Sequence, residues 1–163
     1  MVDVQTVSIA IASAGVFVAA IYYVLQLRNQ TRMRQSDLLM RMHLAFSSKE
    51  CCDATLKMGS TDHKDYDEFI KKYGHPFTAG PVQSEFLMMA VFFEGIGVLT
   101  KRKLVDINLV ADLFTVEVAW QKWKPLVEGI RKKTNNPHMG EWFEYLSNET
   151  RRIHQQQIAS KKA

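Results

Sequence analysis

The first segment of the chain is apolar all round. No charged residue occurs from Val4 to Leu27, and the central part reads VSIAIASAGVFVAAIYYVL. At about 1.5 Å per residue, a helix of this length crosses the roughly 30 Å hydrocarbon layer of a membrane. A secretory signal peptide would carry cations before the apolar run, where this chain has only the Asp3 carboxylate. A buried core helix would rarely run this long without a charge. We therefore predict one transmembrane helix in residues 1–27.

The residues at the end of this run predict its orientation. Arg28, Arg32 and Arg34 follow it closely, and cations are enriched on the cytoplasmic side of membrane helices. Tyr22 and Tyr23 come just before them, where aromatic side chains occupy the membrane interface. We expect a single-pass protein of the cell membrane, with its N-terminus outside, the remainder cytoplasmic, and membrane lipid as one partner.

One face of the predicted membrane helix carries only small residues. Ser8, Ala12, Gly15 and Ala19 follow one another at intervals of three or four residues, so they share a helix face. A small-residue face lets a second helix approach closely in lipid, although small residues are also common in membrane helices generally. The stripe favours a protein partner that packs on the membrane helix, and the helical domain is the alternative surface for a protein partner.

The rest of the chain has the apolar periodicity of helices. Residues 28–37 are polar and contain no helix breaker, which predicts a stalk that continues the membrane helix. Apolar positions recur on one face from Leu38, and we expect this helix to end near Gly59. The predicted fold is all-α, with a cytoplasmic bundle of about five helices at 38–150 and a polar tail at 151–163.

The acidic stretch before Gly74 is similar to a calcium loop in composition only. Its acids are Asp62, Asp65, Asp67 and Glu68. A calcium loop needs glycine at its sixth position and a bidentate glutamate at its twelfth, and this spacing is absent. Acids at the start, Lys71 and Lys72 near the end and a glycine directly afterwards instead predict a short helix.

The apolar stretch Val82–Leu99 indicates a central helix covered on every side. Glu94 lies inside it among small apolar neighbours, so its carboxyl group must be paired, protonated or directed outside the domain. An ion pair with a cation from another helix is the plainer interpretation, and a functional acid is the alternative. Gly95 and Gly97 flank Glu94 and would allow another backbone to come close.

The LTKRK segment and Asp106 predict a turn into the next helix. Cations stabilise a helix C-terminus, and aspartate is a good N-cap. A DNA-binding helix-turn-helix would place cations on its second helix, but Val82–Ala119 holds three cations and five acids. We therefore expect no nucleic-acid partner.

Composition sets further limits. The formal charge is only +4, and the two cysteines, Cys51 and Cys52, are adjacent. The five histidines show no metal-ligand spacing. The chain also contains no phosphate-binding glycine loop and no familiar nucleophile–base motif. We expect no metal, no cofactor and no catalytic residue.

Three segments together resemble a known family. They are FFEGIGVLTKRKLVDINLVADLF, the Trp120–Pro125 segment with the downstream Arg131, and EWFEYL. These are similar to a prokaryotic family of domains of unknown function, the 4760 family, over most of Leu38–Leu146. The resemblance implies a membrane helix, a polar stalk and a helical domain, and it implies no established catalytic residue.

The resemblance also implies special positions within the helical domain. They are Glu94, Asp106, Trp123, Arg131 and Glu144. One attractive interpretation pairs Glu94 with Arg131 as a buried ion pair.

These observations favour a membrane-anchored helical interaction module, an accessory or scaffold subunit of a larger complex without catalytic activity of its own. A first alternative is a peripheral module that reads anionic lipid or signals, using the arginines after the membrane helix with Arg131–Lys133 and Lys161–Lys162. A second alternative is an enzyme that uses Glu94 with Glu144 or a histidine.

Overall fold

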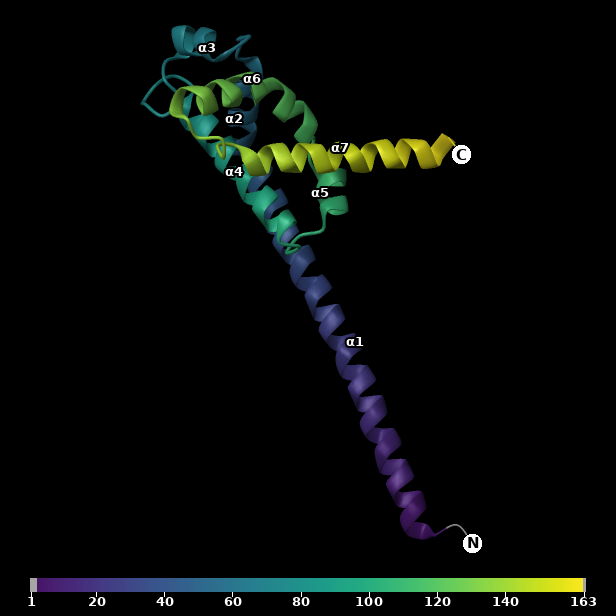
Figure 1. The fold of residues 1–163 in the computed structure, drawn as a ribbon. Helices are drawn as coiled ribbons and strands as arrows, with labels where there is room; N and C mark the ends of the chain where they lie inside the picture. Colours follow the sequence, from purple (N-terminus) through teal and green to yellow (C-terminus); the bar gives the residue numbers. More distant parts are fainter. Residues whose placement is uncertain (1–2, 163) are drawn as a thin grey trace. The chain divides into compact units, whose positions relative to one another are not determined.

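The computed structural model describes residues 3–162, without the side chains of Thr6 and Lys162. This part of the chain forms seven α-helices and no strand (Figure 1). The chain divides into two compact units between Leu38 and Leu39. The all-α prediction is confirmed, and the helices after the first, α2 to α7, slightly exceed the expected number of about five.

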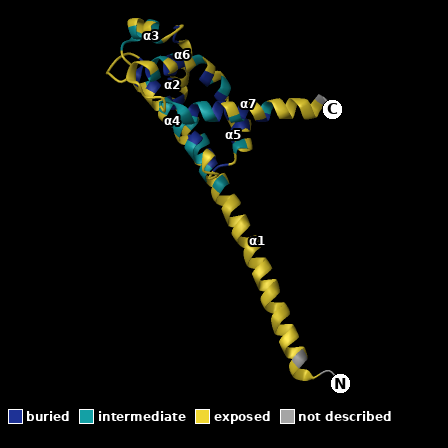
Figure 2. Cartoon of the chain, viewed as in Figure 1, coloured by how far each residue is buried: buried dark blue, intermediate teal, exposed yellow. Residues whose placement is uncertain are grey.

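Helix α1, Val4–Phe46, contains the predicted transmembrane segment and stalk as one uninterrupted helix. The segment contains no proline, so nothing removes a backbone donor along its length. Every described side chain from Val4 to Arg34 is exposed (Figure 2). The apolar run therefore finds no packing partner within its own unit.

The structure corrects the expected length of the next helical segment. Helix α2, Lys49–Ser60, is separate from α1 and begins after Ser48. The backbone of Ser48 is extended, and its hydroxyl oxygen accepts a hydrogen bond from the Cys51 N–H at 3.2 Å. The prediction of one helix continuing to Gly59 is wrong, because Ser48 caps a new helix instead of extending the old one.

Helix α3, Tyr66–Tyr73, has the predicted start and end signals. The Asp65 carboxylate accepts a hydrogen bond from the Glu68 N–H at 2.9 Å. Gly74 follows the helix with a φ of 89°, a left-handed conformation that glycine adopts without strain. The short capped helix is confirmed.

Helix α4, Gln83–Lys101, packs against α2 and α7 in the second unit. Phe86 and Phe93 are buried, whereas Leu87 and Val91 are 50% and 63% exposed. The prediction of a helix covered on every side is wrong, because its neighbours cover only part of its circumference (Figure 2).

Helix α5, Ile107–Leu113, begins at the predicted cap. The Asp106 carboxylate accepts a hydrogen bond from the Asn108 N–H at 2.8 Å. Lys103 supplies the sharp bend of the preceding turn with a φ of 58°. The role of Asp106 as an N-cap is confirmed.

Helices α6, Val116–Thr134, and α7, Glu141–Lys162, complete the unit. Helix α6 continues through Pro125 and ends at Asn135, which is left-handed with a φ of 50°. It packs against α3 and α7, and α7 packs against α4 and α5 as well. Helix α7 therefore packs against three other helices of the unit.

Aromatic rings fill the space between α4, α6 and α7. The ring of Phe143 stacks on Phe93, with centroids 4.4 Å apart and planes 4° apart. Trp120 and Trp123 make T-shaped contacts with the same ring, with centroids 5.1 and 6.0 Å from the Phe143 centroid. Edge-to-face and offset-stacked pairs of this kind stabilise a core beyond the area that they bury. Phe143 is thus the central contact of the three helices.

The segment predicted as a polar tail is the second half of α7. Ile153 is buried. The Nδ1 atom of His154 lies 2.9 Å from Glu117 Oε1, and its Nε2 atom lies 3.1 Å from the carbonyl oxygen of Ala111. These contacts tie the middle of α7 to α5 and α6.

Candidate functional site

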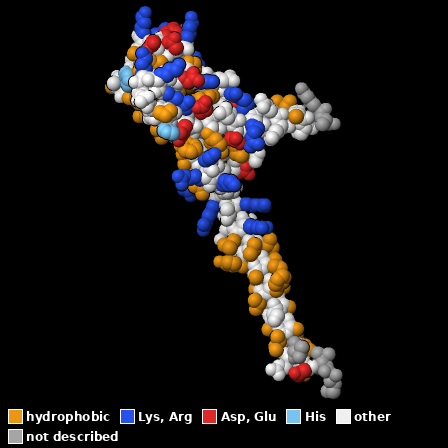
Figure 3. Space-filling model, in the orientation of Figure 1, with side chains coloured by type: hydrophobic (Ala, Val, Ile, Leu, Met, Phe, Trp, Pro, Cys, Tyr) orange, Lys and Arg blue, Asp and Glu red, His pale blue; other side chains and the backbone are white. Residues whose placement is uncertain are grey.

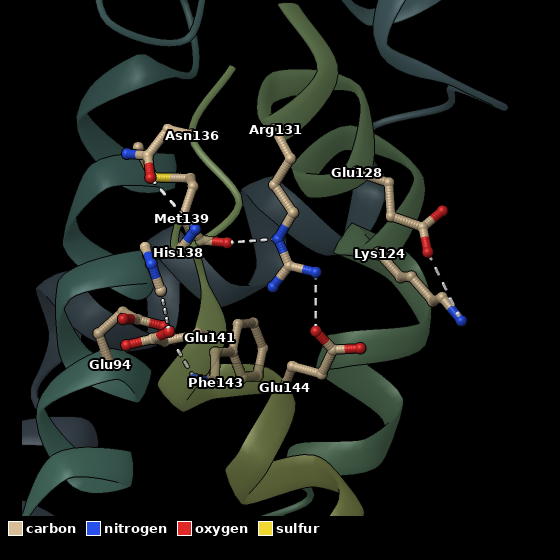
Figure 4. A network of polar contacts seen from close by, with 10 residues as sticks. All are labelled: Glu94, Lys124, Glu128, Arg131, Asn136, His138, Met139, Glu141, Phe143 and Glu144. Carbon is tan, nitrogen blue, oxygen red and sulfur yellow. Dashed lines mark hydrogen bonds and ion pairs between the residues drawn. The ribbon is translucent and has the colours of Figure 1, made fainter. Parts of the chain in front are cut away.

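Glu94 of α4 caps the N-terminus of α7. That helix begins at Glu141, directly after Gly140, which has a φ of 69° and no side chain that could cap it. The Oε1 atom of Glu94 accepts a hydrogen bond from the Phe143 N–H at 2.8 Å (Figure 4). The first N–H groups of a helix have no partner within the helix, and a carboxylate stabilises its positive end. The capping group of α7 is therefore supplied by a different helix.

The surroundings of Glu94 act on its carboxyl group in opposite directions. Burial raises the pKa above the ordinary value for glutamate, and the charge of Glu141 adds to this increase. The backbone N–H groups of Phe143 and Trp142 lower the pKa, because they stabilise the carboxylate. Burial dominates, so Glu94 keeps its proton to higher pH than an exposed glutamate does.

Gly97 allows α4 and α7 to approach closely at this point. A Cβ atom at Gly97 would collide with the backbone carbonyl group of Trp142. By contrast, a Cβ atom at Gly95 would meet nothing within 4 Å. The expectation of a close backbone approach is thus met at Gly97, while Gly95 faces open space.

Arg131 pairs with Glu144 instead of Glu94. Its Nη1 atom lies 2.7 Å from Glu144 Oε2, and its Nε atom donates a hydrogen bond to the carbonyl oxygen of Met139 at 2.7 Å (Figure 4). The Glu94–Arg131 ion pair is wrong, because Arg131 meets acceptors on the turn and helix that directly follow α6. Arg131 and Glu144, both singled out from the sequence, therefore join the end of α6 to the first turn of α7.

A pocket of about 390 Å³ adjoins this cap. Its walls come from α4, α6, the start of α7 and the loop before α4, and they include the rings of Phe77, Trp123 and Trp142. Glu94 is the only charged residue among the described residues that line it, and Gly95 forms part of the wall. The volume and the apolar lining fall within the range of small-molecule sites.

A comparison with family models shows the family of this chain. The model of a family described as "Domain of unknown function (DUF4760)" matches residues 9–150, which is most of the chain. This chain belongs to the DUF4760 family. No curated protein and no solved structure gave a significant match. The resemblance noted in the sequence is confirmed, and the matched region of the DUF4760 protein includes the whole Glu94 pocket.

The residues singled out from the sequence for helix packing in the membrane and for the membrane interface lie on α1 and do not line this pocket. A Cβ atom at Gly15 would meet nothing within 4 Å, so the small-residue face is open in this structure. All of these predicted positions on α1 are exposed: Ser8, Ala12, Gly15, Ala19, Tyr22, Tyr23, Arg28, Arg32 and Arg34. Their roles in helix packing and at the membrane interface stay predictions.

The sequence did not reveal the backbone group that pairs with Glu94. The capping donor is the N–H of Phe143, 49 residues beyond Glu94, and a backbone group leaves no mark on residue type. One signal was available: Gly140, directly before the helix, has no side chain that could cap it, unlike serine, threonine, aspartate or asparagine. The first N–H groups of such a helix are left for water or for a group from elsewhere in the chain.

The polar chemistry of the pocket rests on one carboxyl group. Glu94 is the single titratable side chain among the described residues that line the pocket, and it already receives a hydrogen bond from α7. Among the described residues, no three metal-ligating side chains lie close enough to hold a metal ion.

Proposed function

We propose that this DUF4760 protein is a single-pass membrane protein whose helical domain is a non-enzymatic accessory or scaffold module of a larger membrane assembly. The observation that supports this most strongly is the exposure of the apolar run on α1 (Figure 3). The helix is long and apolar enough to cross a membrane, and none of its most apolar window is buried. Apolar surface costs about 25 cal/mol per Å² in water, so the segment needs lipid or other helices around it.

The cations that follow the apolar run support an orientation with the helical domain in the cytoplasm. Arg28, Arg32 and Arg34 are exposed on α1. Arginines beside a membrane helix stay on the cytoplasmic side during insertion. The N-terminus then lies outside.

Contact with the partner is proposed to occur on the small-residue face of α1. Ala12, Gly15 and Ala19 leave the backbone accessible, and small residues permit close van der Waals contact between helices in lipid. The enzyme alternative receives less support, because the Glu94 carboxylate already caps α7.

The test compares two double variants of the full-length protein in native membranes. Ala12→Leu with Ala19→Leu blocks the small-residue face, whereas Ala10→Leu with Ala14→Leu makes the same chemical change on the opposite face. After extraction in mild detergent, the expected result is a larger particle for the wild type and the control. The blocked face should release the protein from that particle. Extraction by alkaline carbonate would refute the anchor, and a wild-type monomer would refute the accessory role.

The orientation has its own test, because the domain carries one exposed thiol. Cys52 is exposed and Cys51 is buried. A membrane-impermeant maleimide should label Cys52 only after cells are opened. It should label Asp3→Cys, in a Cys52→Ser background, in intact cells. The reverse pattern would show the opposite orientation.

A further inference from the structure

The Glu94 pocket combines an apolar body with one acidic end. Three of its walls are helices, and aromatic rings from α4, α6 and α7 contribute to them, including Phe86, Trp123 and Trp142. A volume of about 390 Å³ is near the lower end of the range for sites that enclose a small ligand. The shape and lining therefore suit a compact molecule with an aromatic or aliphatic body.

The hollow depends on a missing side chain. Gly95 lines the pocket, and a Cβ atom there would meet no neighbouring atom within 4 Å. Two residues along, Gly97 brings the backbone of Trp142 against α4. One glycine thus closes the helix contact while the other leaves space beside the Glu94 carboxyl group.

The charges around the pocket leave its acidic end without a directly paired cation among the residues that the structure describes. Burial and the charge of Glu141 on α7 raise the pKa of Glu94, the charge of Arg131 lowers it, and the Glu141 Oε2 atom lies 2.6 Å from His138 Nδ1. Arg131 is held by Glu144 and by the carbonyl oxygen of Met139. Figure 4 shows Arg131 directed at Glu144 and Met139, Glu94 directed at the Phe143 N–H, and His138 directed at Glu141. A cation placed beside Glu94 would therefore relieve repulsion and gain a charge-assisted hydrogen bond.

We propose that the pocket between α4, α6 and the start of α7 binds a small amphiphile with an apolar body and a protonated amine, the amine lying at Glu94. The pocket rings favour the same ligand, because aromatic faces attract ammonium groups as well as apolar groups. Burial raises the pKa of Glu94 more than the N–H groups of α7 and the charge of Arg131 lower it. This binding role goes beyond the accessory function and does not depend on the membrane helix having a partner.

The test uses phenylbutylamine as the probe and phenylbutanol as a matched neutral probe. The full-length protein is placed in lipid nanodiscs, and empty nanodiscs provide the blank for partition into lipid. All three tryptophans lie in α6 and α7, and Trp123 and Trp142 line the pocket. The tryptophan fluorescence should change with a saturable dependence on the amine. Phenylbutanol should bind about tenfold more weakly, as expected when a charge-assisted hydrogen bond is lost.

Two variants separate the charge from the cavity. Glu94→Gln keeps an oxygen that can accept the Phe143 N–H but removes the charge, and should weaken amine binding about tenfold. Gly95→Leu fills the hollow and should abolish binding. Gly59→Leu is the matched control, since Gly59 also has no neighbour within 4 Å and lies outside this pocket.

Three results would overturn the proposal. Equal affinity for the amine and the alcohol, or an unchanged affinity in Glu94→Gln, would remove the role of the charge. Saturable binding that survives Gly95→Leu would place the ligand elsewhere. The absence of any saturable signal for wild type, with folding verified by circular dichroism, would exclude the site. None of these results bears on the membrane anchor, which the extraction experiment tests separately.

Discussion

Replacing each of the two glycines of α4 by alanine should change the stability of the protein in opposite directions. Gly95→Ala and Gly97→Ala each add one methyl group, and each removes the cost of glycine in a helix, about 1 kcal/mol. At Gly95 the methyl group enters open space, so the variant should gain roughly that amount. At Gly97 the methyl group would collide with the backbone carbonyl group of Trp142, which cannot rotate away as a side chain could.

The structure gives the size of the effect at Gly97. Relieving the collision requires α4 and α7 to separate, and overpacking of this kind costs about 1–3 kcal/mol. Separation also weakens the hydrogen bond from Phe143 to Glu94, which contributes about 1 kcal/mol. After the gain in helix propensity, Gly97→Ala should lose about 2 kcal/mol, and the two variants should differ by about 3 kcal/mol.

The assay is thermal unfolding of the full-length protein in detergent, followed by tryptophan fluorescence. For a chain of this size, 1 kcal/mol corresponds to about 2–4 °C in Tm. The two variants should therefore differ by roughly 6–12 °C, with Gly95→Ala above the wild type and Gly97→Ala below it. A Gly97→Ala variant as stable as Gly95→Ala would show that the helices do not approach closely there.

Three further predictions concern the charged groups of the domain. Glu94→Ala should lose about 1–2 kcal/mol, because the Phe143 N–H loses its acceptor. Glu94→Gln should be at least as stable as the wild type at neutral pH. The Glu94 carboxyl group has a raised pKa in the folded protein, so the wild type is more stable than the variant only at acidic pH and loses that advantage as pH rises. Denaturant titrations at several pH values measure this difference, and a wild type that gains stability over the variant as pH rises would contradict the prediction. Burial lowers the pKa of His63, so the unfolded chain takes up the proton first as pH falls below about 6.5. His63→Leu should reduce the acid destabilisation, and an identical pH profile would contradict this. Arg131→Met should lower the free energy of unfolding by about 1–3 kcal/mol, because Glu144 and the Met139 carbonyl oxygen lose their donor. An unchanged midpoint in chemical denaturation would show that the Arg131–Glu144 pair does not stabilise the fold.

Local signals in the sequence were sufficient for several elements of the fold. Helix α3 is bounded by acids and by Gly74, and α5 is capped by Asp106. Each of these residues interacts with groups no more than one or two helical turns away. Such interactions depend only on neighbours along the chain, so residue order determines them. The apolar run of α1 is of the same kind, because a long uncharged helix is defined by composition alone.

Other local features were misread because two signals competed. The apolar periodicity from Leu38 to Gly59 favoured one helix, yet Ser48 caps a new helix inside it. Periodicity reports which face is buried, whereas the break depends on one hydroxyl group and on the backbone conformation of one residue.

The sequence by itself determined that this DUF4760 protein is helical, that its first helix is apolar enough for a membrane, and that Glu94 needs a special environment. Only the tertiary structure decided what that environment is: the backbone of α7 instead of Arg131, beside a hollow left by Gly95. The reason is physical. A carboxyl group inside an apolar stretch needs a polar partner, and the sequence reveals that need. The sequence does not reveal the partner, because backbone N–H groups are present at every residue except proline. Which of them reaches Glu94 depends on how α4 and α7 pack, and so on contacts between residues far apart in the chain.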